Sequence, residues 1–438
     1  MTKINRYQIF LIAWPIILSN ISTPLLGIVD TAVIGNLGDP ALIGAIALGG
    51  IIFSFLFWGF GFLRMGTTGM VAQAMGASDP VEAKLSLYRA AMAGIGIGIV
   101  LLCLQVPLSF LSFELFEASQ EVEEHAKTYF SIRIWSAPIT LCHLAIIGYL
   151  LGIQDTRSVL LIQLVLNGMN ILLDILFVTI FDWAVPGVAF ATVLSEILAF
   201  GLGLFIVSRK LNFLFSLDGL LDVEKLKRMI LVNRDIMIRT LCLIFAFAWF
   251  TNQGAKFGDI TLAANAILMH LVSLSAFFLD GFALAAETLV GAAVGEKNRS
   301  KLDQIIKLCT ELALITAVSI SFVFWLTGSW IISLMSNVEL VKLEAEEYLI
   351  WAILAPIISV WCYLLDGIFI GATRTTEMRN AMIISLFGFI ATWYIGEIIL
   401  TEAAKNHGLW GALLIYFIFR ALALNHYLPR LKNLDGAK

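Results

Sequence analysis

Charged residues are scarce in this sequence, and their scarcity limits what the protein can be. Only 14% of the 438 residues are charged, whereas 60% are hydrophobic, and the mean hydropathy is +0.91. Soluble globular domains have about a quarter charged residues, so a soluble monomer of this composition could not cover its surface. The 28 Lys and Arg residues against 32 Asp and Glu also exclude the strongly basic surface of a nucleic-acid-binding protein. The composition is typical of an integral membrane protein.

Cysteine is also rare, and its five copies form no recognisable pattern. They are widely separated, and each lies in an apolar run, so the sequence predicts neither a CxxC metal site nor a disulfide framework. The HExxH and GxSxG motifs of metalloproteases and serine hydrolases are absent as well. We therefore expect neither an enzyme nor a cofactor.

Long apolar runs dominate the chain. A hydrocarbon core of about 30 Å requires about 20 helical residues. Twelve runs of this kind occur, at 7–34, 44–75, 88–113, 129–153, 158–181, 184–207, 230–253, 261–295, 306–334, 348–371, 381–400 and 408–428. The sequence therefore predicts an all-α polytopic membrane protein with twelve transmembrane helices.

Lys and Arg gather in alternate loops between these runs. If both termini lie in the cytoplasm, the inner loops and ends hold 21 basic residues and the outer loops hold 5. Positively charged loops stay on the cytoplasmic side, so we predict that both termini are cytoplasmic. The acidic segment 114–124 then lies outside, which is allowed because acidic residues contribute little to orientation.

The two halves of the chain resemble each other. GYLLGIQDT (148–156) aligns with GIFIGATRT (367–375), and VAQAMG (71–76) aligns with VGAAVG (290–295), both at an offset of 219 residues. Six spans per half is an even number, so both halves enter the membrane in the same direction. This pattern predicts two six-helix lobes related by a parallel pseudo-twofold repeat, an architecture of transporters with sites near mid-membrane.

The longest polar interruption between runs falls at mid-chain and gives the lobe boundaries. We predict an N-lobe at 1–207, a cytoplasmic linker at 208–229 and a C-lobe at 230–438.

Ionisable residues within the apolar runs are candidates for function because each costs at least about 2.5 kcal/mol to insert. Those of the first half are Asp30, Arg64, Asp174 and Glu196. Asn170 and Asp174 are one helical turn apart and share a face, as do Thr192 and Glu196. With Asp30 they can converge in one lobe. The alternative for Asp30 is a solvated position at the outer end of its span, and Arg64 either pairs with an acid of its lobe or extends to the interface.

Two carboxylates, an amide oxygen and a hydroxyl form a site suited to a proton or a small alkali cation. Desolvation and mutual repulsion oppose full ionisation of a close carboxylate pair, so Asp30 and Asp174 can take up and release protons. Pro15 precedes Asp30 on the same run by about 22 Å of helix and removes a backbone hydrogen bond. It either couples protonation to bending or forms a static kink.

The second half has its own ionisable residues in apolar runs. Asp280 and Glu287 are seven residues apart and share a helical face, and Asp366 comes from another run. These residues form a second polar cluster or line a cavity. Aromatic residues are dense near 53–62 and 277–282, where they either face lipid or bind flat organic cations.

Four segments carry a resemblance to a known family. FLRMGTTGMVAQAMG (62–76), NRDIMIRTL (233–241), LAANAILMH (262–270) and LDGFALAAETLVGAAVG (279–295) resemble the DinF-like branch of the MATE family, the multidrug and toxic compound extrusion transporters. The resemblance covers essentially the whole chain. It implies two V-shaped bundles of six helices and antiport of substrate against H⁺ or Na⁺.

The resemblance also implies roles for individual residues. Asp30 matches the first-span aspartate of DinF-like proteins, Asn170, Asp174 and Thr192 match the polar cluster that faces it, and Pro15 matches the residue at which that helix is proposed to bend. The same four oxygens are the candidate Na⁺ ligands. In the NorM-like branch the cation site lies in the C-lobe, where the corresponding candidates are Glu287 and Asp366.

The expected function is secondary active efflux of amphipathic organic cations and drugs, such as ethidium or fluoroquinolones, by alternating access. On this interpretation the chain is a multi-pass protein of a bacterial inner membrane, surrounded by lipid and able to work as a monomer. The alternative is a flippase for lipid-linked saccharides, which related folds support. A flippase would need a basic cavity for the diphosphate, whereas acids outnumber Arg64 among the charges identified within the spans.

Overall fold

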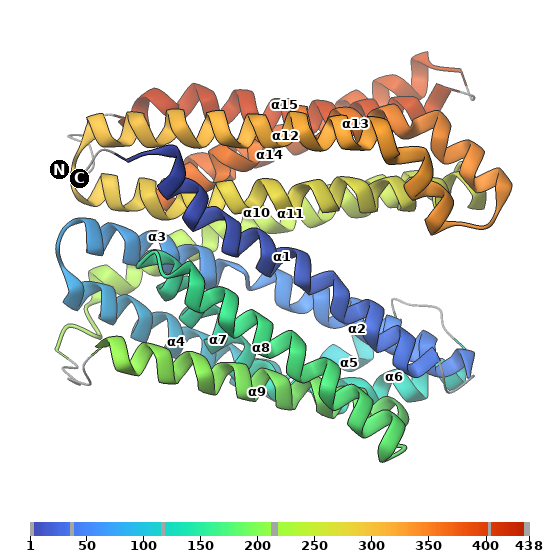
Figure 1. Cartoon of the computed structure of the whole chain (residues 1–438), viewed down its shortest axis with the longest axis horizontal. Coiled ribbons are helices and arrows are strands. Elements are labelled where there is room, and N and C mark those ends of the chain that lie inside the picture. Colours follow the sequence, from blue (N-terminus) through green and yellow to red (C-terminus); the bar gives the residue numbers. More distant parts are fainter. Residues whose placement is uncertain (1–3, 36–38, 115–118, 212–217, 402–403, 433–438) are drawn as a thin grey trace. The chain divides into compact units, whose positions relative to one another are not determined.

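The computed structural model describes residues 4–35, 39–114, 119–211, 218–401 and 404–432, and all regular structure in these residues is helical (Figure 1). The helices of the first half are α1 Arg6–Gly35, α2 Pro40–Gly59, α3 Phe62–Gly76, α4 Pro80–Cys103, α5 Gln105–Glu114, α6 Gln120–Arg133, the 3₁₀ turn η1 Ile134–Ser136, α7 Ala137–Gly152, α8 Thr156–Asp174, the π-helical η2 Ile175–Ile180 and α9 Ala184–Leu211. Those of the second half are α10 Val223–Ala255, α11 Asp259–Gly295, α12 Arg299–Met335, α13 Glu339–Gly371, α14 Thr375–Ile399 and α15 Lys405–Lys432.

The chain divides into two compact units, and α1 belongs to both. One unit contains residues 18–230, and the other contains residues 1–17 together with 231–438. The division falls inside α1, two residues after Pro15. Helix α9 continues to Leu211 and α10 begins at Val223, so helix occupies both ends of the segment that the sequence assigned to the linker.

Most of the helical segments are suited to a membrane by length and composition. Among the described residues, ten segments are long and apolar enough to cross a bilayer. Helices α1 and α10, with 30 and 33 residues, lie outside that set. The prediction of an all-α polytopic membrane protein is confirmed, and the count of twelve crossings stays a prediction.

The turns before α4 and α12 show the internal repeat in backbone detail. Ser78 and Lys297 both have positive φ, 59° and 53°. The next residues, Asp79 and Asn298, cap these helices by accepting a hydrogen bond from the backbone N–H three residues later, at 2.9 and 3.0 Å. A side-chain oxygen at this position satisfies one of the free N–H groups that begin a helix. The two turns are 219 residues apart, as the aligned segments predicted.

Close packing of helix backbones follows the same repeat. A Cβ atom on Gly148 of α7 would fall on the backbone oxygen of Arg64 in α3, and one on Gly367 of α13 would fall on that of Ala283 in α11. Both members of each pair are 219 residues apart. Small residues let membrane helices approach until their backbones touch. The repeat is therefore a repeat of packing as well as of sequence.

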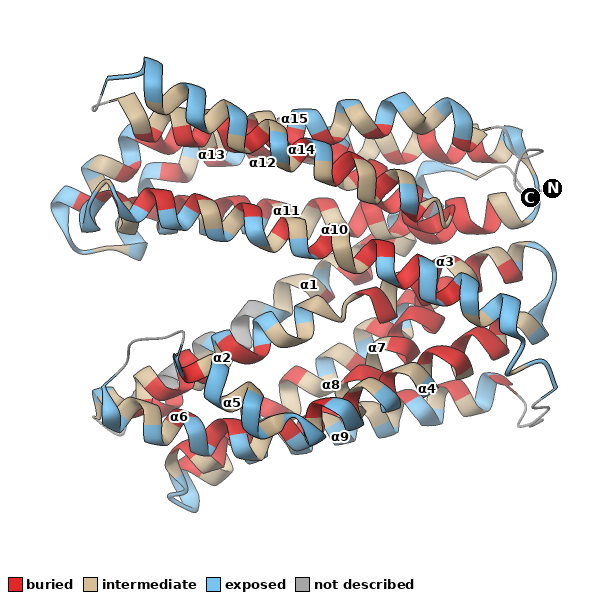
Figure 2. Cartoon of the chain, turned by 180° about the vertical axis from the view of Figure 1, so that it is seen from behind, coloured by how far each residue is buried: buried red, intermediate tan, exposed pale blue. Residues whose placement is uncertain are grey.

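Burial is arranged in stripes within each unit. Helices α3, α7 and α11 are largely buried, whereas α4, α9 and α12 have long exposed faces (Figure 2). The exposed faces carry large apolar side chains such as Val100, Phe205 and Phe322. Apolar faces of this length are what helices in contact with lipid tails present.

We expect Gly148→Ala to destabilise the protein. The added methyl group forces α7 away from α3, and overpacking of this kind costs about 1–3 kcal/mol. Thermal unfolding of the purified protein in detergent should show a clear fall in the midpoint temperature. Gly96→Ala in α4 is the control, because no atom lies within 4 Å of the Cβ that it adds. Equal midpoints for the two variants would show that the close approach of α7 and α3 is not a constraint.

Candidate functional site

Asp30 of α1 and Asp174 of α8 meet in the interior of the unit formed by residues 18–230. Their carboxyl groups are in hydrogen-bonding contact, and Asp174 is fully buried. Among the described residues, no donor reaches either oxygen of Asp174 or the Oδ1 atom of Asp30. Ionised carboxylates can only accept hydrogen bonds, so two of them in contact require a proton or a metal cation between them.

Asn170 and Thr192, the other predicted members of the cluster, lie beside this pair. Asn170 is buried one turn before Asp174, and its Nδ2 atom lies 3.4 Å from Thr192 Oγ1 of α9 as a weak hydrogen-bond donor. Thr192 Oγ1 itself donates to the backbone oxygen of Val188 at 3.0 Å. The amide oxygen of Asn170 has no donor among the described residues. The structure therefore brings together all four residues that the sequence proposed, with several acceptor oxygens unsatisfied.

A second polar contact fixes α1 against α8. Asn167 Nδ2 donates to Ser22 Oγ at 2.7 Å, and Gln163 Nε2 donates to Asn167 Oδ1 at 3.0 Å. Ser22 precedes Asp30 by about two helical turns, as Asn167 precedes Asp174. The same faces of α1 and α8 therefore meet along both turns, which orients the two carboxyl groups toward each other.

Arg133 and Tyr129 of α6 join the cluster, although the sequence placed Arg133 in an outer loop. The guanidinium donates from Nη1 to Tyr129 Oη at 2.8 Å, and its Nη2 atom lies 3.9 Å from Glu196 Oε1. Its carbon Cζ lies 4.8 Å from the ring centre of Phe53, within the range of a cation–π contact. Arg133 also acts electrostatically on Asp30. The only sequence signal was the one-turn spacing of Tyr129 and Arg133 at the start of an apolar run.

Glu196 has its own partners and is held away from the carboxyl pair. Thr140 Oγ1 donates to Glu196 Oε2 at 2.7 Å, and the other oxygen faces Arg133. The positive charge of Arg133 therefore offsets that of Glu196. Arg64, the other charged candidate of this unit, takes part in none of the ion pairs recorded among the described residues, and its buried Nη1 atom has no hydrogen-bond partner there.

The candidates of the second half have different surroundings. Asp366 of α13 is buried and accepts hydrogen bonds from Arg239 and from Arg420, the latter at 2.6 Å. A cation at Asp366 would have to compete with two guanidinium groups, neither of which the sequence interpretation used. Glu287 of α11 is buried, and Asp280 lies two turns earlier at intermediate burial. Neither of them shares the ion pairs of Asp366.

Tryptophans occupy the positions in the second half that correspond to the carboxyl pair. At the offset of 219, Asp30 corresponds to Trp249 of α10 and Asp174 corresponds to Trp393 of α14. The two indole rings are in contact, with centroids 5.5 Å apart and planes at 86°. The repeat therefore preserves the contact between the two helices but replaces a pair of acids with a pair of aromatic rings. This part of the second half has no equivalent proton site.

We expect Arg133 and Glu196 to be energetically coupled. Removing the guanidinium by Arg133→Met leaves buried polar atoms unpaired, which costs about 1–3 kcal/mol. A double-mutant cycle with Glu196→Gln, measured by thermal unfolding, should give non-additive losses. The exposed pair Arg6–Glu311 is the control, since exposed pairs contribute at most about 1 kcal/mol. Additive losses for Arg133 and Glu196 would mean that the two side chains do not act as a unit.

Comparison with known proteins identifies the family. The profile of the MatE family matches residues 15–176 and 236–395. DNA damage-inducible protein F of Escherichia coli (strain K12) is 39% identical over 421 residues, covering 94% of this chain and 90% of its own. Two solved structures share the fold: a MOP superfamily transporter from Pyrococcus furiosus, with a TM-score of 0.89, 19% identity and coverage of 99% and 97%, and a MATE protein in the bent conformation, with 0.87, 20%, 98% and 96%. The chain is a member of the MATE family of multidrug efflux transporters.

Proposed function

We propose that the protein exports amphipathic organic cations in exchange for protons, with Asp30 and Asp174 as the coupling site. The observation that carries this proposal is the contact of two buried carboxyl groups with no other donor among the described residues. Such a pair is suited to bind a proton, and release of the proton leaves a buried negative charge. We place the transporter in a bacterial inner membrane with both termini in the cytoplasm, and we propose that it works as a monomer.

The charge of the pair gives each state of the transporter a different affinity for its ligands. A deprotonated pair attracts an organic cation, and protonation from the outer side removes that attraction and favours release. Exchange requires this difference, because a ligand shifts a conformational equilibrium only by its differential affinity for the two states. Asn170 and Thr192 would stabilise the deprotonated state as neutral neighbours, and Arg133 would limit the electrostatic cost of the remaining charge.

Sodium is the alternative coupling ion at the same site. Asp30, Asn170, Asp174 and Thr192 together offer two carboxylates, an amide oxygen and a hydroxyl, which are the hard oxygen ligands that such cations prefer. The partnerless oxygens of Asn170 and Asp174 fit a cation as well as they fit a proton. The choice between the two ions is therefore the first outcome to be measured.

We further propose that α1 transmits the state of this site to the rest of the protein by bending at Pro15. The first part of α1 is packed tightly against α11, because a Cβ on Gly281 would fall on the side chain of Ile17. The second part is held to α8 through Ser22 and Asp30. Pro15 lies just before the change of partners, where it removes one backbone hydrogen bond of α1. A local weakness between two anchored segments is suited to a hinge.

A lipid-linked saccharide flippase is the second candidate function. Arg239 and Arg420 share the single carboxylate of Asp366 inside one unit, so buried positive charge is more abundant than the sequence suggested. The transporter from Pyrococcus furiosus is described as having a binding pocket of reverse polarity that suggests a different function. Basic groups of this kind would suit the diphosphate of a lipid-linked saccharide.

We expect Asp30→Asn to abolish coupled transport while leaving the fold intact. Asparagine has nearly the same shape as aspartate but cannot bind and release the coupling proton. The measurement is ethidium uptake into inside-out proteoliposomes, with an acidic lumen or a sodium-loaded lumen imposed separately. Asp174→Asn should behave in the same way, and Asp303→Asn, which changes an exposed aspartate paired with Lys432, should transport normally.

Each outcome of this experiment decides between the proposals. Uptake that is driven by the pH gradient and lost in both cluster variants supports proton coupling. Uptake driven only by sodium assigns the same oxygens to a Na⁺ site. Normal uptake by Asp30→Asn contradicts the coupling role, and no uptake under either gradient favours the flippase.

We expect Pro15→Ala to slow transport severalfold without destabilising the protein. Alanine restores the missing hydrogen bond and is the better helix former by about 3 kcal/mol in a helix interior, so α1 becomes stiffer at the hinge. Initial rates of ethidium uptake and thermal unfolding should be measured together. Pro429→Ala, a change at a proline inside α15, is the control. A rate equal to that of the wild type would remove Pro15 from the mechanism.

A further inference from the structure

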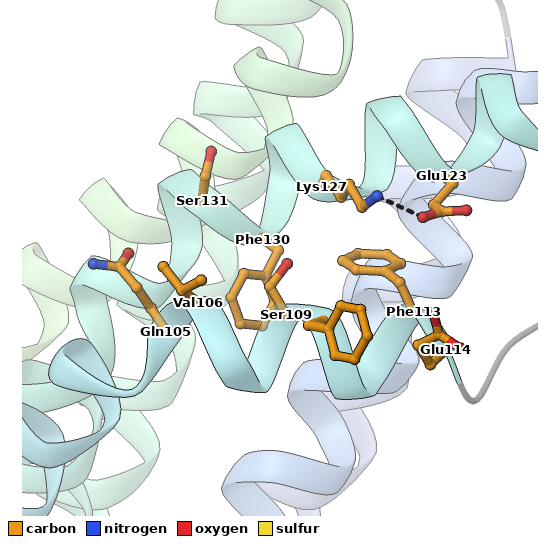
Figure 3. A pocket seen from close by; sticks show the side chains of 10 residues that line it. Gln105, Val106, Ser109, Phe113, Glu114, Glu123, Lys127, Phe130 and Ser131 are labelled. Carbon is orange, nitrogen blue, oxygen red and sulfur yellow. Dashed lines mark ion pairs between the residues drawn. The ribbon is translucent and has the colours of Figure 1, made fainter.

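A pocket of about 670 Å³ lies between α5 and α6, apart from the carboxyl cluster (Figure 3). Phe113 and Phe130 are buried and form its base, with ring centroids 6.3 Å apart. Its rim includes Val106 and Phe110, which are 74% and 67% exposed. The remaining lining residues are Gln105, Ser109, Glu114, Glu123, Lys127 and Ser131.

The polarity of this pocket changes from one end to the other. Figure 3 shows Glu114, Glu123 and Lys127 together at one end and Gln105, Val106 and Ser131 at the other. The two ends are separated by nine residues of α5, about 13 Å along the helix axis. The charged end is the one that the predicted topology directs toward the outer surface, so the gradient follows that of the outer leaflet, from headgroup to hydrocarbon.

Charges of both signs are present at the polar end. Lys127 Nζ lies 2.5 Å from Glu123 Oε1 and 5.7 Å from the ring centre of Phe113, while its side chain is 51% exposed. An ammonium group has three donors, so Lys127 can accept a further acidic partner from the pocket. Glu114 is exposed at the same end and offers a carboxylate to a group of positive charge.

We propose that this pocket binds a phospholipid of the outer leaflet with a zwitterionic phosphoethanolamine headgroup. Lys127 contacts the phosphate, Glu114 accepts hydrogen bonds from the ammonium group, and an acyl chain runs along Phe130 toward Val106. A headgroup with net negative charge meets two carboxylates and a single base, and an organic cation meets Lys127 in front of the Phe113 ring. Only the zwitterion has a partner of opposite charge for each of its charged groups.

The pocket is connected to the carboxyl cluster by side-chain packing. Phe130 of the pocket base lies 5.3 Å from Phe53 between ring centroids, and Phe53 supports the guanidinium of Arg133. A lipid against Phe130 therefore stabilises the position of α6, which carries Tyr129 and Arg133. The expectation that lipid binding supports transport rests on the proposed function, whereas lipid binding itself does not.

Native mass spectrometry of the full-length protein in detergent tests the proposal directly. Phosphatidylethanolamine, phosphatidylcholine and phosphatidylglycerol are titrated separately, and the wild type should retain phosphatidylethanolamine most strongly. Lys127→Ala removes a charge-assisted contact, which should raise the dissociation constant about tenfold or more. Ser109→Trp, which fills the pocket, should have a similar effect. Lys342→Ala, which breaks an i,i+3 pair with Glu339, and Ser333→Trp on an exposed face of α12 should leave retention unchanged.

The outcomes separate lipid binding from transport. Retention by Lys127→Ala and Ser109→Trp equal to that of the wild type would overturn the proposal, as would a preference for phosphatidylglycerol. Displacement of ethidium rather than of lipid by these two changes would make the pocket a substrate site and would also overturn it. Selective loss of phosphatidylethanolamine in both variants supports the proposal even if neither variant, nor the wild type, transports ethidium.

Discussion

The contact between the carboxyl groups of Asp30 and Asp174 imposes a condition that the surrounding structure has to meet. Two acceptor groups cannot remain in contact in a buried site unless a proton or a cation lies between them. Their backbones are held in place by the Ser22–Asn167 hydrogen bond and by the packing of α6. The acids therefore cannot simply move apart when they lose the proton. The negative charge must instead be balanced by a ligand or relieved by a change of conformation.

The internal repeat explains how one lobe carries this condition and the other does not. Backbone contacts at Gly148 and Gly367 are equivalent, because a glycine is needed wherever two helix backbones touch. Side chains away from those contacts are free to differ, and Trp249 and Trp393 take the positions of the two acids. The buried Asp366 of the second half is occupied by two arginines. The same packing thus supports a titratable pair in one half and an aromatic pair in the other.

Helix α1 connects these two halves in a way that neither half shows alone. Its first turns pack with the unit that contains α11, and its later turns pack with the unit that contains α8. Pro15 weakens the helix just before the change of partners. A rearrangement that moves one part of α1 would therefore change the geometry of Asp30, since both lie on one continuous helix. This linkage gives a physical basis for coupling ion binding to movement.

The sequence by itself determined the membrane class, the helical spans and the offset of the repeat, because these depend on composition and on local periodicity. It also identified Asp30, Asn170, Asp174 and Thr192, since polar residues within apolar runs stand out and a one-turn spacing puts two of them on one face. The tertiary structure alone decided that Arg133 and Tyr129 join this cluster and that Arg239 and Arg420 share Asp366. Those contacts join residues far apart in the chain, and their geometry is set by which helix faces pack together, which no local pattern of residues records.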